Sequence, residues 1–268
     1  MPNVTRWRIR VRAWRRFRRV RRRFWRSAAR DLRTLQTIYD NGVLFGDRSE
    51  RAWGIRYRQG DFNMTSDSAL FAPRPDWEDR GYRADEYGHW LKGAWFDYDG
   101  PMEILARVDG LVLSCDGRQS IAVDSIDDVA LPLLEGNIID QFRTSAKGWV
   151  SGKGRAAVWL DIAPGEGVVE PQYLIGMKTA AARISKIGDD AGQPKWRPVP
   201  KVVFIDVTSA TNVRTARATC TPYFPCGNTA AVLGARESVF ALATVMNSFV
   251  YDFVARAMRR LASERLRG

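Results

Sequence analysis

Apolar residues recur every three or four positions in several segments of the chain, which is the spacing of an amphipathic helix. In residues 31–45 this stripe consists of Leu32, Leu35, Ile38 and Tyr39. The Asn41-Gly42 pair that follows predicts the end of this helix. In residues 237–263 the stripe consists of Val239, Leu242, Met246, Phe249 and Phe253. We expect this second segment to form one long helix whose apolar face lies in the core.

Short runs with strand character lie between these two segments, separated by Gly, Pro and Asp. In the first half they are WGIRYR, MEILARV, GLVLS and SIAV. After a predicted loop, GWVSGKG, further runs follow: AAVWLDIA, QYLIGM, KVVFIDVT and VRTARATC. The pattern predicts an α/β fold of the mixed α+β kind with two small β-rich lobes, residues 31–147 and 148–268. The second lobe ends in the long helix, and an Arg-rich arm, residues 1–30, precedes the first.

The arm combines a helical apolar stripe with dense positive charge. Its stripe consists of Trp7, Val11, Trp14, Phe17, Val20 and Phe24. Such a helix suits an anionic surface, either the phosphates of a nucleic acid or an acidic membrane. A disordered arm, or translation of GC-rich DNA upstream of the true start, gives the same composition.

The net charge of +12 is confined to this arm. Thirteen of the 42 basic residues lie in residues 1–30, which contain no acid, so the remaining chain has 29 basic and 30 acidic side chains. The body is therefore close to neutral. Three cysteines without a CxxC pair indicate free thiols in the cytoplasm, and no apolar run approaches the roughly 20 residues of a membrane span.

Catalytic and metal-binding signatures are weak or missing. A single histidine, His89, excludes the common zinc spacings, and its Tyr, Gly and Trp neighbours indicate a surface or packing role. The chain lacks the (N/D)PP(Y/F) tetrapeptide of adenine methyltransferases, and Pro75-Asp76 has no following acid and lysine of a nuclease site. The GxGxxA match at residues 152–157 is interpreted as a flexible basic loop in which Lys153 and Arg155 contact phosphates.

Four stretches of the chain resemble, in the same order, segments of large adenine-specific methylases of type IIG restriction systems and BREX-type phage defence. The first is WGIRYRQGDFNMTSDSALF at residues 53–71. The others are LPLLEGNIIDQF (131–142), VVFIDVTSATNVRTARATCTP (202–222) and NSFVYDFVAR (247–256). In that family these stretches follow the catalytic methylase domain, in the region of the TaqI-like DNA-specificity module.

The resemblance implies the target-recognition part of a site-specific adenine-N6 DNA methyltransferase, without its catalytic core. Its ligand would be double-stranded DNA, and its partner a separate methylase or defence-system subunit. The family uses S-adenosylmethionine, but we expect no cofactor, metal or catalytic residue in this chain. Together with the basic loop, the resemblance assigns DNA contacts to Thr65, Asp67, Ser68, Asn137, Lys153, Arg155, Thr208, Asn212, Arg214 and Arg256. Other positions shared with the family are Met64, Glu135, Gly136, Ile138, Phe142, Asp206, Thr215, Asn228, Asn247, Ser248 and Asp252.

Alternatives to this interpretation stay open. Polar residues of such motifs often cap turns, and Arg214 is suited either to DNA or to an ion pair with an acid such as Asp206. Asn137 stands where the family usually has Lys, which removes a cationic contact. The resemblance stops abruptly on both sides, so an inactive, truncated gene fragment is one alternative function. The other is a protein that binds nucleic acid or acidic membrane non-specifically through its Arg-rich helix.

Overall fold

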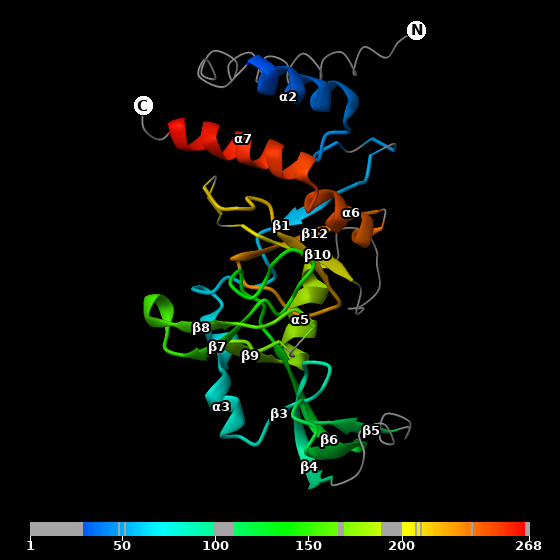
Figure 1. Cartoon of the computed structure of the whole chain (residues 1–268). Coiled ribbons are helices and arrows are strands. Elements are labelled where there is room, and N and C mark those ends of the chain that lie inside the picture. The colour runs from blue at the N-terminus through cyan, green and yellow to red at the C-terminus, as the bar shows by residue number, and fades with distance from the viewer. Residues whose placement is uncertain are drawn as a thin grey trace. The chain divides into compact units, whose positions relative to one another are not determined.

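The computed structural model describes residues 29–47, 49–50, 52–98, 110–165, 169–188, 200–206, 208–209, 211–236 and 238–265 (Figure 1). Most of the Arg-rich arm, residues 1–28, and the expected strand MEILARV lie outside them, as does the side chain of Arg155. The described residues form helices and antiparallel sheets. The fold is therefore mixed α+β, as the sequence predicts.

The chain divides into two compact units. The helical unit consists of Met1–Ile55, Ser209–Thr215 and Ser248–Gly268, and the β-rich unit of Arg56–Thr208 and Ala216–Asn247. The lobe boundary expected at residues 147 and 148 does not separate these units. Strands from both sides of it pair in one sheet of the β-rich unit, because long-range pairing overrides the local loop signal.

One sheet of the β-rich unit has four antiparallel strands in the order β1, β12, β10 and β11. Their bounds are Arg56–Arg58, Ala230–Gly234, Lys201–Ile205 and Ala218–Thr221. Val202, Val203 and Leu233 at its centre are fully buried, which accounts for the nearly continuous apolar runs in the sequence. Helix α6 (Val239–Met246) packs against β10 and β11.

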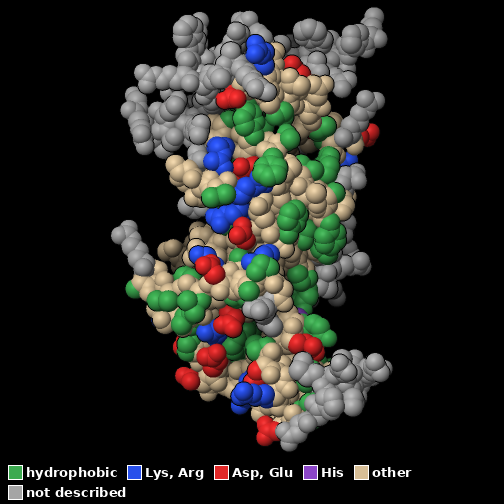
Figure 2. Space-filling view, in the orientation of Figure 1, with side chains coloured by type: hydrophobic (Ala, Val, Ile, Leu, Met, Phe, Trp, Pro, Cys, Tyr) green, Lys and Arg blue, Asp and Glu red, His purple; other side chains and the backbone are tan. Residues whose placement is uncertain are grey.

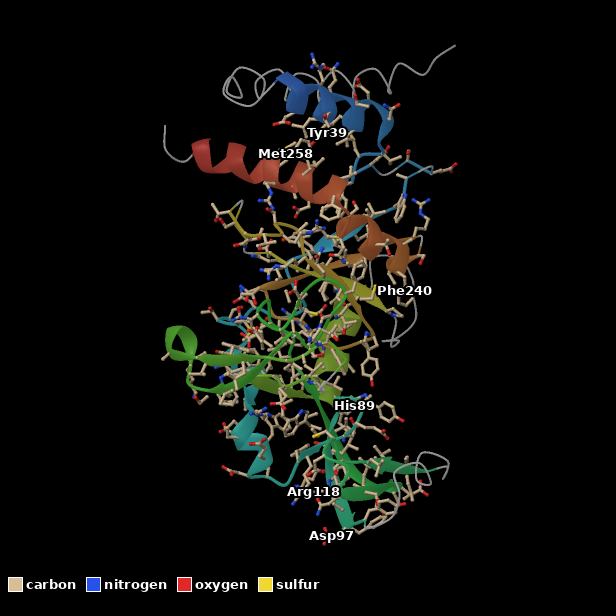
Figure 3. All side chains as sticks on the ribbon, in the orientation of Figure 1. Tyr39, His89, Asp97, Arg118, Phe240 and Met258 are labelled. Carbon is tan, nitrogen blue, oxygen red and sulfur yellow. The ribbon has the colours of Figure 1, made fainter. Side chains whose placement is uncertain are left out.

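A second sheet has the strand order β2, β9, β6, β4 and β3, with β5 pairing β6 (Figure 1). Their bounds are Ala72–Pro73, Tyr173–Gly176, Gln119–Pro132, Trp90–Asp97, Arg83–Ala84 and Leu111–Leu113. Two helices belong to the same part of the fold, α3 (Arg74–Glu78) and α5 (Met177–Gly188). Asp97 and Arg118 lie at the distal end of the β4 and β6 pair, where Asp97 faces Gln119 (Figure 3).

A separate two-stranded ribbon pairs β7 (Lys147–Ser151) with β8 (Val158–Asp161). The prediction of a loop over residues 148–154 is therefore wrong for its first half. Trp149 pairs with Trp159 across the ribbon, and its backbone N–H donates to the carbonyl oxygen of Glu170 at 3.0 Å. The chain turns only at Gly152, before the short 3-10 helix η2 (Gly154–Ala156).

The main core of the β-rich unit includes apolar residues of three of the four stretches singled out in the sequence, 53–71, 131–142 and 202–222. Its fully buried members include Phe62, Leu131, Leu133, Leu134, Ile138, Val203 and Cys226. The LPLL sequence thus forms the end of β6 and the chain just after it. These stretches shape the interior, so many of their apolar residues serve packing.

The described part of the helical unit contains α2 (Ala29–Asn41) and α7 (Phe249–Arg265). Helix α2 confirms the prediction for this segment, and the N–H of Gly42 donates to the carbonyl oxygen of Ile38 at 2.8 Å at its end.

The single helix expected over residues 237–263 is wrong. The chain forms α6 and α7, with a break at Asn247 and Ser248, because the Ser248 hydroxyl accepts from the N–H of Tyr251 and caps a new helix. Among the described residues no single helix is long and apolar enough to cross a bilayer, and only the bent pair α6 and α7 meets that criterion by length and composition.

Candidate functional site

The turn after β6, residues 135–143, is anchored tightly to the loop before β12. The N–H of Gly136 donates to Thr229 Oγ1 at 3.0 Å, and a Cβ at Gly136 would lie 2.7 Å from the Thr229 carbonyl oxygen. Just before it, the N–H of Leu134 donates to Pro225, and the Leu134 carbonyl oxygen accepts from Gly227, both at 2.8 Å. Only glycine permits this close approach, so the EGN sequence fixes where the turn lies.

The turn closes on itself at its tip. Asp140 and Arg143 exchange backbone hydrogen bonds of 3.0 and 3.2 Å, which leaves Gln141 and Phe142 between them. Phe142 has a φ of 58°, in the left-handed region, and 61% of it is exposed. Its N–H donates to the Ala218 carbonyl oxygen at 2.9 Å. The tip therefore presents an aromatic ring from a backbone that is held in an unfavourable conformation.

Ala218, whose carbonyl oxygen accepts from the N–H of Phe142, is itself bound by the buried side chain of Asn247. Asn247 accepts from the Ala218 N–H at 3.0 Å and donates to the Ala218 carbonyl oxygen at 2.7 Å. Asn247 is only 6% exposed, and its own carbonyl oxygen accepts from Gln141 Nε2. The second, third and fourth family-like stretches thus meet at one hydrogen-bonded point of the β-rich unit.

A polar cavity of about 340 Å³ adjoins the turn. It opens between the turn, the β7 and β8 ribbon, the end of β10 and the start of β11. Its lining includes three cationic side chains, two carboxylates and one exposed amide: Arg143, Lys147, Arg217, Asp140, Asp161 and Asn137. This composition suits a ligand that carries negative charge and hydrogen-bonding edges.

The three cations of the cavity differ in how they are engaged. Arg143 donates to the carbonyl oxygens of Ile162 at 2.6 Å and Ser145 at 3.2 Å, which fixes its guanidinium. Lys147 lies 3.5 Å from Asp161, its cross-strand neighbour. The Nε of Arg217 is buried and has no hydrogen-bond acceptor among the described residues. A buried donor without an acceptor is uncommon in folded proteins, so this Nε marks Arg217 for closer attention.

Glu135, at the start of the turn, is a half-buried acid whose Oε2 is buried. Its Oε2 has no hydrogen-bond partner among the described residues, and burial raises its pKa from 4.5 to about 7. The pKa of Tyr173 is also raised, first by burial and then by the charge of Glu135. Near neutral pH the carboxyl group is partly protonated, so it both donates and accepts.

Three of the predicted contact residues belong to a self-capped turn in the first stretch. Asp67 Oδ2 accepts from the N–H of Asn63 at 2.8 Å, and Asn63 Oδ1 accepts from the N–H of Thr65 at 2.9 Å. Arg183 lies 3.4 Å from Asp67. Thr65 and Ser68 are exposed, and Ser68 begins the 3-10 helix η1 (Ser68–Leu70). Asp67 therefore has structural partners, whereas Thr65 and Ser68 are exposed residues.

Three further predicted residues lie in the helical unit, where the loop 209–215 is bound to α7. Asp252 Oδ1 accepts from the N–H of Thr215 at 2.7 Å. Arg256 donates to the Val213 carbonyl oxygen at 2.9 Å and pairs with Asp252 at 3.2 Å. The Arg214 guanidinium lies 4.5 Å from the centre of the Phe249 ring. The side chains of Arg256 and Arg214 thus contact their own unit, and Asn212 bonds through its N–H to Ser209.

The predicted contact residues do not form one cluster. Asn137 alone among them lines the cavity, while Lys153 is exposed before η2 and Thr208 is half-buried. The sequence reasoning missed the cavity cations Arg143, Lys147 and Arg217. A signal was available for two of them, since Arg217 lies within the third family-like stretch and Arg143 directly follows the second. DNA contact by any of these residues stays a prediction.

His89 occupies a separate polar cluster near β3 and β4 (Figure 3). Asp85 Oδ1 accepts from the N–H groups of Tyr87 and His89 at 2.9 and 2.7 Å, and Asp85 Oδ2 lies 2.8 Å from His89 Nδ1. The other ring nitrogen bonds to the hydroxyl of Tyr223, and the two rings are stacked. With both nitrogens engaged inside the protein, the geometry fits a packing role for His89.

On the face shown in Figure 2, Lys and Arg side chains lie among Asp and Glu side chains over the β-rich unit. This matches the near neutrality of the sequence outside the arm. Any affinity of this unit for a polyanion must then come from a few placed side chains rather than from a broad positive field.

Comparisons with protein-family models, curated proteins and solved structures find no match to this chain. Within the described ranges, no group of three or more His, Cys, Asp or Glu side chains is arranged to hold a metal ion. The turn 135–143 and its cavity are the features of the β-rich unit that combine unsatisfied polar atoms, strain and exposure.

Proposed function

We propose that this chain recognises double-stranded DNA as the target-recognition part of a site-specific adenine-N6 methyltransferase in a restriction-modification or phage-defence system. Methyl transfer would be carried out by a separate methylase subunit, in the cytoplasm. The observation that carries the proposal is the polar cavity, because residues of the second and third family-like stretches line it together.

The side chains at this cavity suit the edges and backbone of DNA. An asparagine amide pairs with the N6 and N7 atoms of adenine, and a guanidinium pairs with the edge of guanine or with a phosphate. Asn137 is exposed, Arg217 is half-buried, and both line the cavity. Both project from backbone that is fixed by hydrogen bonds, and such fixed support is what base discrimination requires.

Under this proposal the body supplies the sequence-specific part of DNA binding and the arm the sequence-independent part. Each neutralised phosphate contributes about −0.9 to the slope of log affinity against log salt. The near-neutral body offers few such contacts, so its binding should depend weakly on salt but strongly on sequence. The arm, with its thirteen arginines, would supply the sequence-independent part.

A selection from random duplexes tests the proposal. The full chain is mixed with a 30-base-pair library containing a random core and with excess heterogeneous competitor DNA, and bound duplexes are amplified through several rounds. We expect one defined sequence to be enriched. Retention of duplexes without any enriched sequence would contradict target recognition.

A second candidate function has its own observation, the thirteen arginines and no acid in residues 1–30. Under this alternative the chain binds nucleic acid or acidic membrane through the arm alone. Replacing the arm arginines by glutamine distinguishes the two functions. Target recognition predicts that the enriched sequence survives the replacement with lower overall affinity, whereas the alternative predicts that all DNA binding is lost.

A further inference from the structure

Phe142 has a backbone conformation that a phenylalanine rarely adopts. Its φ of 58° is the one positive value among non-glycine residues in the described part of the chain. A side chain with a Cβ clashes with the backbone in this region, so the conformation persists only where surrounding bonds enforce it. Here the hydrogen bond to Ala218 and the reciprocal bonds of Asp140 and Arg143 enforce it.

Core packing of the ring does not explain this strain. Phe142 is 61% exposed, whereas Ile138 and Ile139 of the same turn are almost fully buried. Glycine or asparagine would adopt the same backbone conformation with less strain. The sequence instead places a large, exposed apolar ring on strained backbone, and backbone strain of this kind is concentrated at functional sites.

The surroundings of the ring indicate its ligand. Asp140 and Arg143, on either side of it in the turn, line the cavity, and so does Arg217, which precedes its support Ala218. An apolar ring beside placed cations matches a nucleic acid, in which stacked bases lie next to phosphates.

We infer that Phe142 is a wedge that inserts into a base step of duplex DNA while Asn137 and Arg217 bind the flanking base edge or phosphate. This inference rests on the proposed DNA-recognition function and adds the mode of contact. Apolar wedges between base pairs partly unstack and kink the duplex. Unstacking costs less where a base is missing or mismatched, so a wedge prefers such sites.

The test measures this preference with the full chain. Fluorescence anisotropy gives the affinity for a 30-base-pair duplex and for the same duplex with one central abasic site. We expect the unmodified protein to bind the abasic duplex about ten-fold more tightly, which corresponds to about 1.4 kcal/mol of saved unstacking. Binding of both duplexes with equal affinity would overturn the wedge alone, whereas binding of neither would contradict the proposed function.

Four variants make the assignment specific. F142G and F142A remove the ring, and glycine also relieves the strained φ; both should lose the preference for the abasic duplex. F142W keeps an aromatic plane and should retain it. F96A, which removes an exposed aromatic from β4, is the matched control and should also retain it. Preference retained by F142G, or a melting temperature lowered far more by F142G than by F96A, would show that the ring has no wedge role.

Discussion

Two polar clusters of the β-rich unit, one around Asp61 and one in the turn 135–143, are built on opposite principles. Asp61 has a fully buried side chain, yet both of its oxygens are satisfied. Oδ1 pairs with Arg58 at 2.9 Å, and Oδ2 pairs with Lys201 at 2.5 Å and accepts from the N–H of Cys226 at 3.0 Å. This cluster joins β1, β10 and the loop before β12.

In the turn 135–143 and its cavity, by contrast, some groups are strained or have no hydrogen-bond partner. Glu135 Oε2 is buried without a partner among the described residues, and Phe142 is strained. Arg217, which lines the adjoining cavity, has a buried Nε that also has no partner among the described residues. Satisfied polar groups stabilise a fold, whereas strained backbone and buried groups without partners are often found at functional sites. The comparison therefore assigns stability to the Asp61 cluster and makes the turn the candidate for function.

The largest effect on stability is expected from removing Asp61 from its cluster. Asp61→Ala leaves the Lys201 ammonium buried without its partner, so we expect a loss of about 3 to 5 kcal/mol in the free energy of unfolding. Urea denaturation measures it. Asp161→Asn is the matched control, because Asp161 is exposed and lies 3.5 Å from Lys147, and it should cost less than about 0.5 kcal/mol. Equal losses for both variants would contradict the contrast between the clusters.

The next effect concerns Glu135 and pH. Because the folded pKa is raised from 4.5 to about 7, the carboxyl group destabilises the fold once the unfolded chain ionises. Stability is complete below pH 4.5 and falls as pH rises toward 7, by about 3 kcal/mol at 1.36 kcal/mol per pH unit.

Glu135→Gln removes this titration. Urea unfolding from pH 4 to pH 8 should give parallel stabilities below pH 4.5 and a variant that is progressively more stable than the unmodified protein above it. The difference between the two proteins cancels the contribution of the groups that both proteins share. A stability difference between the two proteins that stays constant with pH would show that folding does not raise the pKa of Glu135.

A smaller loss is expected from removing the support beneath the turn. Asn247→Ala leaves the buried N–H of Ala218 without its amide partner and removes one donor to the Ala218 carbonyl oxygen. We expect a loss of about 2 kcal/mol in unfolding free energy. Asn137→Ala, which truncates an exposed amide, should change the same urea transition by less than about 0.5 kcal/mol. If the two asparagine variants prove equally stable, Asn247 does not support the tip.

The smallest stability effect separates strain from packing. Phe142→Gly relieves the left-handed backbone, worth about 1 to 2 kcal/mol, but adds about 0.5 to 1 kcal/mol of chain entropy to the unfolded state. The unfolding free energy should therefore stay within about 1 kcal/mol of the unmodified value, or rise slightly. A loss above about 2 kcal/mol, measured by urea denaturation, would mean that the ring stabilises the fold.

The spacing of apolar residues predicted those helices and strands that depend on neighbouring residues in the sequence. The helix at residues 29–41 and the strands β8, β9 and β10 follow from apolar spacing and from turn residues such as Gly42. The break between α6 and α7 was not predicted, because the apolar stripe continues through it. The Asn247 side chain that marks this break bonds to Ala218, 29 residues away in sequence.

The candidate site was predicted less completely, for a related reason. The family-like stretches named Asn137, Glu135 and Phe142, but no sequence pattern shows that a phenylalanine adopts a positive φ. That conformation depends on the carbonyl oxygen of Ala218, supplied from a distant strand. Arg217 was missed because it stands in an alternating run, where an arginine is typical of a solvated strand face.

The most direct measurement is the sequence discrimination of a cavity variant. Each protein is titrated with the duplex that the full chain enriches and with a scrambled duplex. The ratio of the two affinities is measured for the unmodified protein, Arg217→Ala and Arg118→Ala. Arg118 is an exposed arginine at the distal end of the β4 and β6 pair, so its loss removes the same charge far along the sheet from the turn after β6 (Figure 3). We expect Arg217→Ala to reduce the ratio about ten-fold or more, as the loss of a base contact worth about 1 to 3 kcal/mol requires, and Arg118→Ala to leave it within about two-fold. A ratio that both variants leave unchanged would contradict recognition of DNA through this cavity.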